Sequence, residues 1–373
     1  MDWRNIPKLI DWRPIVSEMD AQLRRATSAM REQLGSVPRI VHVAYTNSEF
    51  RKIDEDIFRE VTDAAKSVDV AYDIDKVYIN DASAEATLRG HVLTLGADPS
   101  VHGIIQHGAS FYGRDPPLYL EAIDPLKDID CMTSTCGRWL KSGDGPFVLP
   151  TTGAILKILS YGLRPRPLAE VSVALLKGGW HPYASYPLDL LEVVLRCRSV
   201  TTYVDPSPDH TERVRRADAI VSQVGKQSYL DGRYVREGQI VIDVEAIADR
   251  SDADLDSVIP AIGAYANSVT VSNLKLRISF FNAMRAFLLK QDRRIASPLM
   301  SLVEIAMSDV PRAERTCSAR SRQPLRAGTC LPQFKKWGPI YSMTRQGLPY
   351  GLGRGCISNT LEAVDFTAQS ESS

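Results

Sequence analysis

The chain has no excess charge of either sign and no cysteine pattern typical of a disulfide or zinc protein. Its 373 residues include 45 lysines and arginines and 45 aspartates and glutamates, so no overall field favours nucleic acid or an anionic membrane. Six cysteines in a chain of this length do not make a disulfide scaffold, and no Cys-x-x-Cys pair indicates zinc. We therefore expect reduced thiols, no bound metal and no nucleic-acid partner.

Long hydrophobic runs are also absent. The chain begins Met-Asp-Trp-Arg-Asn, without the basic start and apolar stretch of a signal peptide, and no run of 18 or more apolar residues could span a bilayer. We expect a cytoplasmic protein without membrane contact. With 44% hydrophobic residues, the chain can still bury a substantial core, in two domains or in one domain with extensions.

The apolar residues that are present predict an alternation of helices and strands in both halves of the chain. Helices are expected at 13–34, from a cap at Ser48 to about Ala65, at 83–95, at 187–196 and at 269–289. Strands are expected at 40–44, 76–79, 101–105, 171–176, 199–204, 219–224 and 238–244. The second set of strands is apolar enough for a parallel sheet that is covered on both faces.

The C-terminal part has a different composition. From Pro311 to Arg354 there are nine lysines and arginines against one acidic residue, Glu314, with little periodicity. The segment is either a basic arm for nucleic acid or a partner, or a disordered extension. The second interpretation includes non-native coding beyond the last domain.

The most informative stretch is the acidic loop Asp124-Pro-Leu-Lys-Asp-Ile-Asp130. It resembles the Pro-x-Lys-Asp-Val-Asp-Gly signature of the bifunctional methylenetetrahydrofolate dehydrogenase/cyclohydrolases. In that family the second aspartate of the signature binds the pterin ring of folate, and the resemblance assigns this role to Asp130. The glycine that follows in the family is Cys131 here.

Framework motifs extend the resemblance over residues 10–292. They are His102-Gly-Ile-Ile, Gly137-Arg138, Phe147-x-x-Pro150-Thr-Thr-Gly153, the run from Ala217 to Gly225-Lys, the run from Gly238 to Val244, and Val269-Thr-Val-x-x-Leu274. The resemblance implies an α/β protein with two domains that flank a cleft, and a homodimer. The implied parts are a folate-type catalytic domain at 1–148, completed by a helix at about 269–292, a Rossmann-like NAD(P)-binding domain at 149–268, and an irregular or disordered basic tail at 293–373.

The family's catalytic helix carries Tyr-x-x-x-Lys, whose tyrosine stacks on folate and whose lysine serves proton transfer and iminium formation. Alignment on Arg59-Glu60-Val61 places Phe50 at the tyrosine and Asp54 at the lysine. A slip that brought Lys52 to this position would need an insertion or deletion inside a helix. Because an ionised carboxylate only accepts hydrogen bonds, we do not expect the cyclohydrolase step. A solvated helix carboxylate is the alternative for Asp54.

The next candidate residues are Gln106 and His107. Counting from Gly103 places His107, rather than Gln106, at the glutamine of the family's folate loop. Asp54, His107 and Asp130 would then form a carboxylate, imidazole and carboxylate group suited to general acid/base catalysis, or to a divalent metal. A simple polar contact is the alternative for His107, and Gln106 is a candidate substrate contact.

The family's phosphate loop, Gly-Arg-Ser-x-x-Val-Gly-x-Pro, corresponds to residues 179–187. Only the first glycine, Gly179, and the final proline are retained. Glycines let the backbone approach a pyrophosphate, and the family's arginine recognises the additional phosphate of NADP. Trp180 replaces this arginine, Ser185 replaces the second glycine, and His181 lies between them. These four residues are the candidates for a modified cofactor loop.

Further cofactor and substrate candidates lie in later loops. Asp205 directly follows the predicted strand 199–204. In dinucleotide-binding folds a carboxylate at this position accepts a hydrogen bond from the ribose 2′-hydroxyl of the cofactor, which favours NAD over NADP. The alternative is that Asp205 is part of a turn without a cofactor role. Gly225 follows the next strand as another cofactor candidate. The family's glycine-rich third ligand loop corresponds to 263–270, which makes Val269 and Thr270 candidate substrate contacts.

The resemblance implies a divergent one-carbon enzyme that transfers a hydride between a methylene derivative of tetrahydrofolate and NAD or NADP. Hydride transfer depends on positioning more than on a proton shuttle, so it tolerates the loss of the lysine better than the cyclohydrolase step does. One alternative is a repurposed enzyme of the same fold with acid/base or hydrolytic chemistry on another substrate, for instance in specialised metabolism. The other is a non-catalytic paralogue.

Overall fold

The computed structural model describes most of the first 306 residues. The described ranges are 7–46, 51–78, 84–108, 120–142, 145–178, 197–244 and 251–306. Residues 307–373, which include a separate unit at 322–373, lie outside them, as do the predicted cap at Ser48 and the predicted helix at 187–196. None of the helices in the described ranges is long and apolar enough to cross a membrane.

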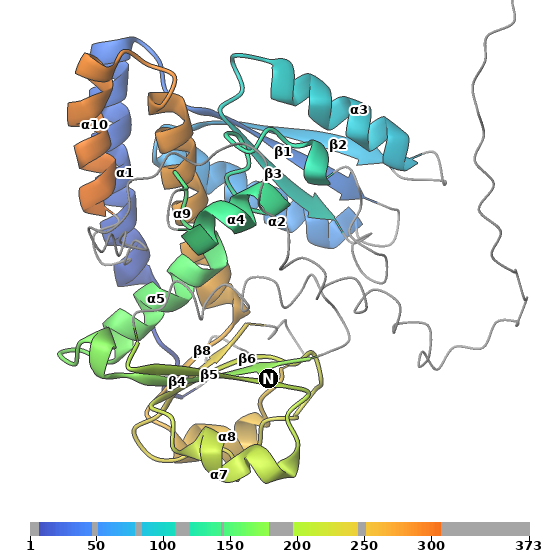
Figure 1. Ribbon diagram of the computed structural model, residues 1–373, viewed down its shortest axis with the longest axis vertical. Helices are drawn as coiled ribbons and strands as arrows, with labels where there is room; N and C mark the ends of the chain where they lie inside the picture. The colour runs from blue at the N-terminus through green and yellow to red at the C-terminus, as the bar shows by residue number, and fades with distance from the viewer. Residues whose placement is uncertain are drawn as a thin grey trace, which may run out of the picture. The chain divides into compact units, whose positions relative to one another are not determined.

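The first sheet has three parallel strands in the order β2-β1-β3 (Figure 1). Its strands are β1 (Arg39–Thr46), β2 (Ala71–Tyr78) and β3 (Gly103–Gly108), and its helices are α1 (Arg13–Leu34), α2 (Arg51–Ser67) and α3 (Ala84–Ala97). Successive residues of a strand face opposite sides of the sheet. In β1, His42 contacts Phe58 of α2 on one face, whereas Val41 and Val43 pack with Leu88 of α3 on the other.

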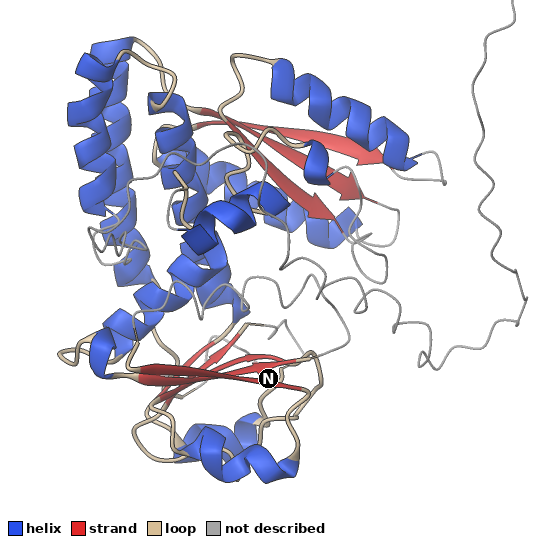
Figure 2. Ribbon diagram, in the orientation of Figure 1, coloured by secondary structure: helices blue, strands red, loops and turns tan. Residues whose placement is uncertain are grey.

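The second sheet has five parallel strands in the order β5-β4-β6-β7-β8, drawn in red in Figure 2. The strands are β4 (Ser172–Lys177), β5 (Ser199–Val204), β6 (Ala219–Gln223), β7 (Ile240–Asp243) and β8 (Ala264–Ala266), with the helices α7 (Thr211–Arg215) and α8 (Leu255–Ala261). In β4, Val173 and Leu175 belong to one hydrophobic cluster, and Ala174 and Leu176 to another. Both faces of the sheet are therefore covered, as is usual for parallel strands.

Two helices, α5 (Pro150–Gly162) and α9 (Ser268–Leu288), pack closely against each other. Gly153 permits this approach, because a Cβ atom there would lie 2.8 Å from Cδ1 of Ile278. Helix α9 is also tied to α1, since the Arg277 guanidinium donates to both carboxylate oxygens of Asp20, at 2.9 and 3.1 Å. Both side chains of this pair are nearly buried, so the orientation of α9 about its axis is fixed.

Helix α10 (Arg293–Ala306) corrects the prediction of an irregular tail from residue 293. Ala296, Leu299 and Val303 recur at helical spacing and are buried, and the helix packs against α1. The basic composition that suggested an irregular segment begins only at Pro311, so it does not describe the residues before it.

The remaining predicted elements in the described ranges agree in type with the observed ones, although β2 begins at Ala71 rather than at residue 76. The short strand β8 lies within the predicted third ligand loop. Elements without a prediction include α4 (Ser134–Ser142), α5, α8 and the 3₁₀ helices η3 (Leu120–Ala122), η4 (Leu168–Glu170) and η5 (Pro208–His210). The two-sheet α/β architecture expected from the sequence is thus observed.

Candidate functional site

Two of the three charged residues in the Lys-Asp-Ile-Asp run are structural. The Lys127 ammonium is buried and donates to the carbonyl oxygens of Leu95, Gly96 and Asp98, at 3.1, 2.6 and 2.6 Å, where α3 ends. The last carbonyls of a helix have no partner within the helix, so a cation there is favourable. Asp128 accepts from the amides of residues 132 and 133, at 3.0 and 2.7 Å, and burial raises its pKa.

Asp130, the third charged residue, points to helix α9. Its carboxylate is only 5% exposed. The Ser279 hydroxyl donates to Oδ1 at 2.8 Å, and the Lys275 ammonium lies 3.3 Å from Oδ2. Lys275 and Ser279 are four residues apart and therefore share one side of α9. Lys275 is 39% exposed, so the pair joins a buried anion to a cation that reaches solvent.

The backbone around Asp130 is held on both sides. The Asn282 amide group donates to the carbonyls of Ile129 and Val148, both at 2.8 Å, and its oxygen accepts from the Val148 amide at 3.1 Å. Cys131 follows with a φ of 59°, in the left-handed region. Glycine adopts this conformation without cost, whereas another residue loses about 1–2 kcal/mol. This left-handed conformation explains why the family signature has glycine at the position of Cys131. The present chain keeps the same conformation with a cysteine.

A tyrosine and a histidine that the sequence analysis did not single out lie near this carboxylate. The Tyr72 hydroxyl is 2.8 Å from Nδ1 of His42, and the Tyr72 ring packs edge-on against Phe280, the residue after Ser279. Burial raises the pKa of Tyr72 well above its usual value, and the negative charge of Asp130 raises it further. Tyr72 is therefore a neutral hydroxyl. Strand alternation was the signal that could have identified the pair, because both residues face the same side of the first sheet.

The predicted trio of Asp54, His107 and Asp130 is only partly described. Position 54 lies one helical turn before Phe58 in α2, and position 107 pairs with Ala44 in the register of β3 with β1. Helix α2, which contains position 54, covers the His42 side of the sheet. The side chains of Asp54 and His107, and all of Phe50, lie outside the described residues, so convergence with Asp130 stays a prediction.

The structure does not bring Gln106 together with Asp130. Gln106 pairs with Val43, whose side chain packs on the α3 side of the sheet, opposite to His42. The oxygen and nitrogen of its side-chain amide are buried without a hydrogen-bond partner among the described residues. A one-residue difference in a strand thus decides which face a side chain reaches.

Thr270 and Val269 lie in the first turn of α9. Asn267 caps this helix, and its Oδ1 accepts from both the amide and the hydroxyl of Thr270, each at 3.1 Å. Thr270 is fully buried, and the Val269 carbonyl accepts from Asn273 at 2.9 Å. The Thr270 hydroxyl therefore helps to start the helix that presents Lys275.

The cofactor candidates Gly179, Trp180, His181 and Ser185 lie outside the described residues. Asp205, directly after β5, is 53% exposed and lies 3.9 Å from the Lys226 ammonium. Its φ of 42° is consistent with the turn that was the alternative interpretation. An exposed carboxylate at the end of this strand can also accept from a ribose hydroxyl.

The turn around Gly225, which has a φ of 70°, is held by a buried carboxylate. Asp252 accepts from the Ser222 hydroxyl at 2.7 Å and from the amides of Val224 and Lys226 at 2.6 and 3.0 Å. These two amides are therefore occupied within the protein. Gly225 permits the left-handed turn that directs them to Asp252.

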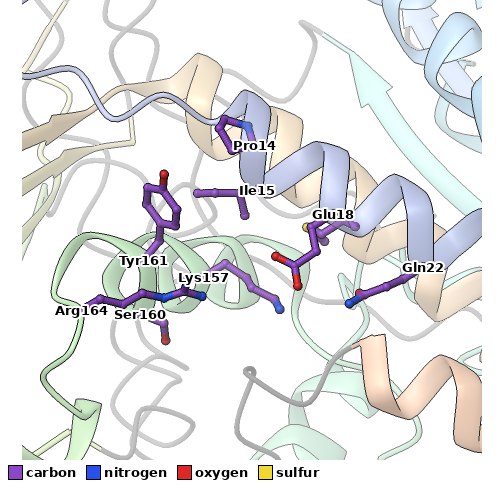
Figure 3. Close-up of a pocket in the computed structure, with 9 residues that line it drawn as sticks. Pro14, Ile15, Glu18, Gln22, Lys157, Ser160, Tyr161 and Arg164 are labelled. Atoms are coloured by element: carbon purple, nitrogen blue, oxygen red, sulfur yellow. The ribbon is translucent and has the colours of Figure 1, made fainter.

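A cavity of about 70 Å³ lies between α1 and α5, away from the candidate residues. Its lining includes Glu18, Gln22, Lys157 and Arg164 (Figure 3). Small-molecule sites usually have volumes of roughly 300–1,000 Å³, so this cavity is too small for a pteridine or a dinucleotide. The cavity does not include Asp130, and we base the candidate site on the contacts of Asp130 instead.

Comparisons with known proteins give the same family in sequence and in structure, although no family model matches the chain. The chain is 28% identical over 236 residues to "Bifunctional protein FolD 1" of Rhodococcus jostii, and the alignment covers 62% of this chain and 76% of that protein. It is 31% identical over 190 residues to "Bifunctional protein FolD" of Methanoculleus marisnigri, and this alignment covers 49% of this chain and 65% of that protein.

Two solved structures show the fold. The methylenetetrahydrofolate dehydrogenase-cyclohydrolase (FolD) of Trypanosoma brucei, complexed with NADP and an inhibitor, has a TM-score of 0.62 at 20% identity and covers 75% of this chain and 96% of its own. The NAD-dependent methylenetetrahydrofolate dehydrogenase of Saccharomyces cerevisiae has a TM-score of 0.60 at 13% identity, and the superposition covers 75% of this chain and 96% of the yeast chain. In sequence and in fold, the chain is therefore a divergent relative of the bifunctional FolD proteins.

Proposed function

We propose that the chain is a divergent tetrahydrofolate-dependent enzyme of one-carbon metabolism, with hydride transfer like that of a methylenetetrahydrofolate dehydrogenase. The carboxylate of Asp130 carries this proposal. It is buried, fixed by Ser279 and Lys275, and placed by a loop whose other charged residues are structural. Each carboxylate oxygen can accept a second hydrogen bond, so the group can also bind the N–H edge of a pterin.

The described residues fit a dinucleotide partly. Asp205 offers an exposed acceptor at the end of β5, which favours NAD, and we include NADP as the second candidate. Gly225 shapes the loop after β6, although the amides on either side of it are bonded to Asp252. A nicotinamide, when bound, accepts the hydride. The protein's own contribution is to orient the pterin through Asp130 and to hold the two reactants at a fixed distance.

Cyclohydrolase activity is not part of the proposal. The family's lysine is Asp54 in this chain, and a carboxylate cannot donate a proton when it is ionised. The repurposed enzyme, the non-catalytic paralogue, the homodimer and the cytoplasmic location stay predictions.

Turnover of methylenetetrahydrofolate tests the proposal. We expect the full-length protein to reduce NAD, and NADP less well, as measured by the absorbance of the reduced nicotinamide. Asp130→Asn should lower kcat/KM by about 10- to 100-fold, because a hydrogen bond to a charged group is lost. Asp63→Asn, a matched change at an exposed carboxylate of α2, should have no effect.

Absence of turnover with both nucleotides would contradict the proposed reaction. A thermal-shift panel with NAD, NADP, tetrahydrofolate and methenyl analogues then separates the alternatives, because a ligand that binds only the folded protein raises its melting temperature. Folate binding without turnover would support the non-catalytic paralogue, whereas no binding of folate would support a different substrate.

A further inference from the structure

Asp130 and Lys275 place a hydrogen-bond acceptor directly beside a donor. The ammonium nitrogen lies 3.3 Å from Oδ2 of the carboxylate, while Oδ1 accepts from Ser279. A carboxylate only accepts hydrogen bonds when it is ionised, and an ammonium group only donates them. A ligand must therefore present a hydrogen-bond donor to Asp130 and, beside it, an acceptor to Lys275.

The exposure of the two side chains gives the pair a direction. Asp130 is 5% exposed, whereas Lys275 is 39% exposed, so the ammonium is the part that solvent reaches. A ligand that bonds to Asp130 from the open side therefore meets the ammonium group at the same time. An ammonium has three donors, and its bond to Asp130 leaves others available.

The helix that carries Lys275 is held in place. The bidentate contact of Arg277 with Asp20 and the three hydrogen bonds of Asn282 fix α9 at two positions after Lys275. Recognition that depends on groups held by rigid elements is more precise than recognition by loops. The backbone of Lys275 is therefore fixed relative to Asp130, and the ion pair orients its flexible side chain.

We infer that Lys275 is a specificity-determining residue, which makes the Asp130 site prefer a ligand edge with an N–H beside a carbonyl oxygen over an edge with amino groups alone. This inference rests on the proposed function. Among pteridines, the preferred edge is that of the 4-oxo compounds. In an unprotonated 4-amino compound, an amino group replaces the carbonyl oxygen and directs its donors at the Lys275 ammonium. The adjacent ring nitrogen also has no hydrogen to donate to Asp130.

Substitution of Lys275 tests its role in recognition if the variant still folds. Removal of the ammonium leaves the buried Asp130 carboxylate with the Ser279 hydrogen bond alone, which lowers stability, while methionine retains the apolar stem of the side chain. We therefore expect Lys275→Met to fold with a lowered melting temperature, which thermal unfolding checks. Lys275→Arg retains a donor at this position and serves as the conservative variant. Lys66→Met, at an exposed lysine in the last turn of α2, is the matched control.

The test compares the dissociation constants of tetrahydrofolate and its 4-amino-4-deoxy counterpart, measured by calorimetry at a pH where both ligands are unprotonated. The wild type should prefer the 4-oxo compound by on the order of 10- to 100-fold, since pairing with a charged donor is lost in the other. Lys275→Met should lose the part of this preference that the ammonium supplies and keep the part that comes from the N–H bonded to Asp130, whereas Lys275→Arg and Lys66→Met should keep the whole preference.

The outcomes separate the inference from the proposed function. A folded Lys275→Met protein that keeps the full preference would overturn the inference and leave folate binding intact. Equal affinity of the wild type for the two ligands would do the same. If the wild type bound neither pteridine, the proposed function would fail and the inference with it.

Discussion

At the scale of single residues, the acidic loop shows that one run of charged side chains can have three different roles. Lys127 ends α3, Asp128 orders the turn before α4, and Asp130 faces α9. The two aspartates have the same bonding capacity, so their different roles are set by the partners within reach. The role of Asp130 in binding a pterin stays a prediction from the resemblance, whereas its ion pair with Lys275 and its hydrogen bond from Ser279 were not expected.

Cys131 allows a prediction at this scale. We expect Cys131→Gly to be more stable than Cys131→Ala by about 1 kcal/mol, although alanine is normally the more stabilising residue. Both variants lose the buried thiol, so their difference isolates the cost of the left-handed backbone at a φ of 59°. Chemical denaturation of the two proteins measures it. An alanine variant as stable as the glycine variant would show that the backbone there is relaxed.

At the scale of elements, buried polar groups decide how the strands of the second sheet continue into loops. Asp243, at the end of β7, accepts from the Ser251 hydroxyl at 2.7 Å and from the Tyr265 hydroxyl at 3.2 Å. Burial, and next the charge of Asp252, raise the pKa of Asp243 to about 6. Two carboxylates that are buried near each other thus anchor the loops after β6 and β7.

This acid pair predicts the pH dependence of stability. Because the pKa of Asp243 is raised in the folded protein, its protonation favours folding, and that contribution is lost as the pH rises from about 4 to above 6. Relative to Asp243→Asn, the wild type should lose up to about 3 kcal/mol of unfolding free energy between pH 4 and pH 7. Denaturant unfolding at several pH values measures the difference. A constant difference would mean that Asp243 titrates normally.

At the scale of the whole molecule, helices from distant parts of the chain complete the first half of the fold. Helix α9 brings Lys275, Ser279 and Asn282 to a loop more than a hundred residues earlier in the chain. Helix α10 then packs against α1 at the beginning of the chain. The candidate site therefore exists only when the chain is folded as far as α9.

Helix α10 provides the prediction at this scale. A chain that ends at Asp292 should be less stable than one that ends at Ala306 by on the order of 5 kcal/mol, since it lacks three buried apolar side chains and exposes the α1 surface that they cover. The three residues are Ala296, Leu299 and Val303. Thermal unfolding of the two truncated proteins compares them. Equal melting temperatures would show that α10 does not stabilise the fold.

Local patterns in the sequence predicted the alternation of helices and strands, and a motif resemblance singled out Asp130 as a candidate site residue. Periodicity and short motifs are local, so they can be recognised along the chain. The folded structure, by contrast, places Gln106 on the α3 face of the first sheet and brings Lys275 to Asp130. These outcomes depend on strand register and on helix packing between segments far apart in sequence, and no local pattern contains that information.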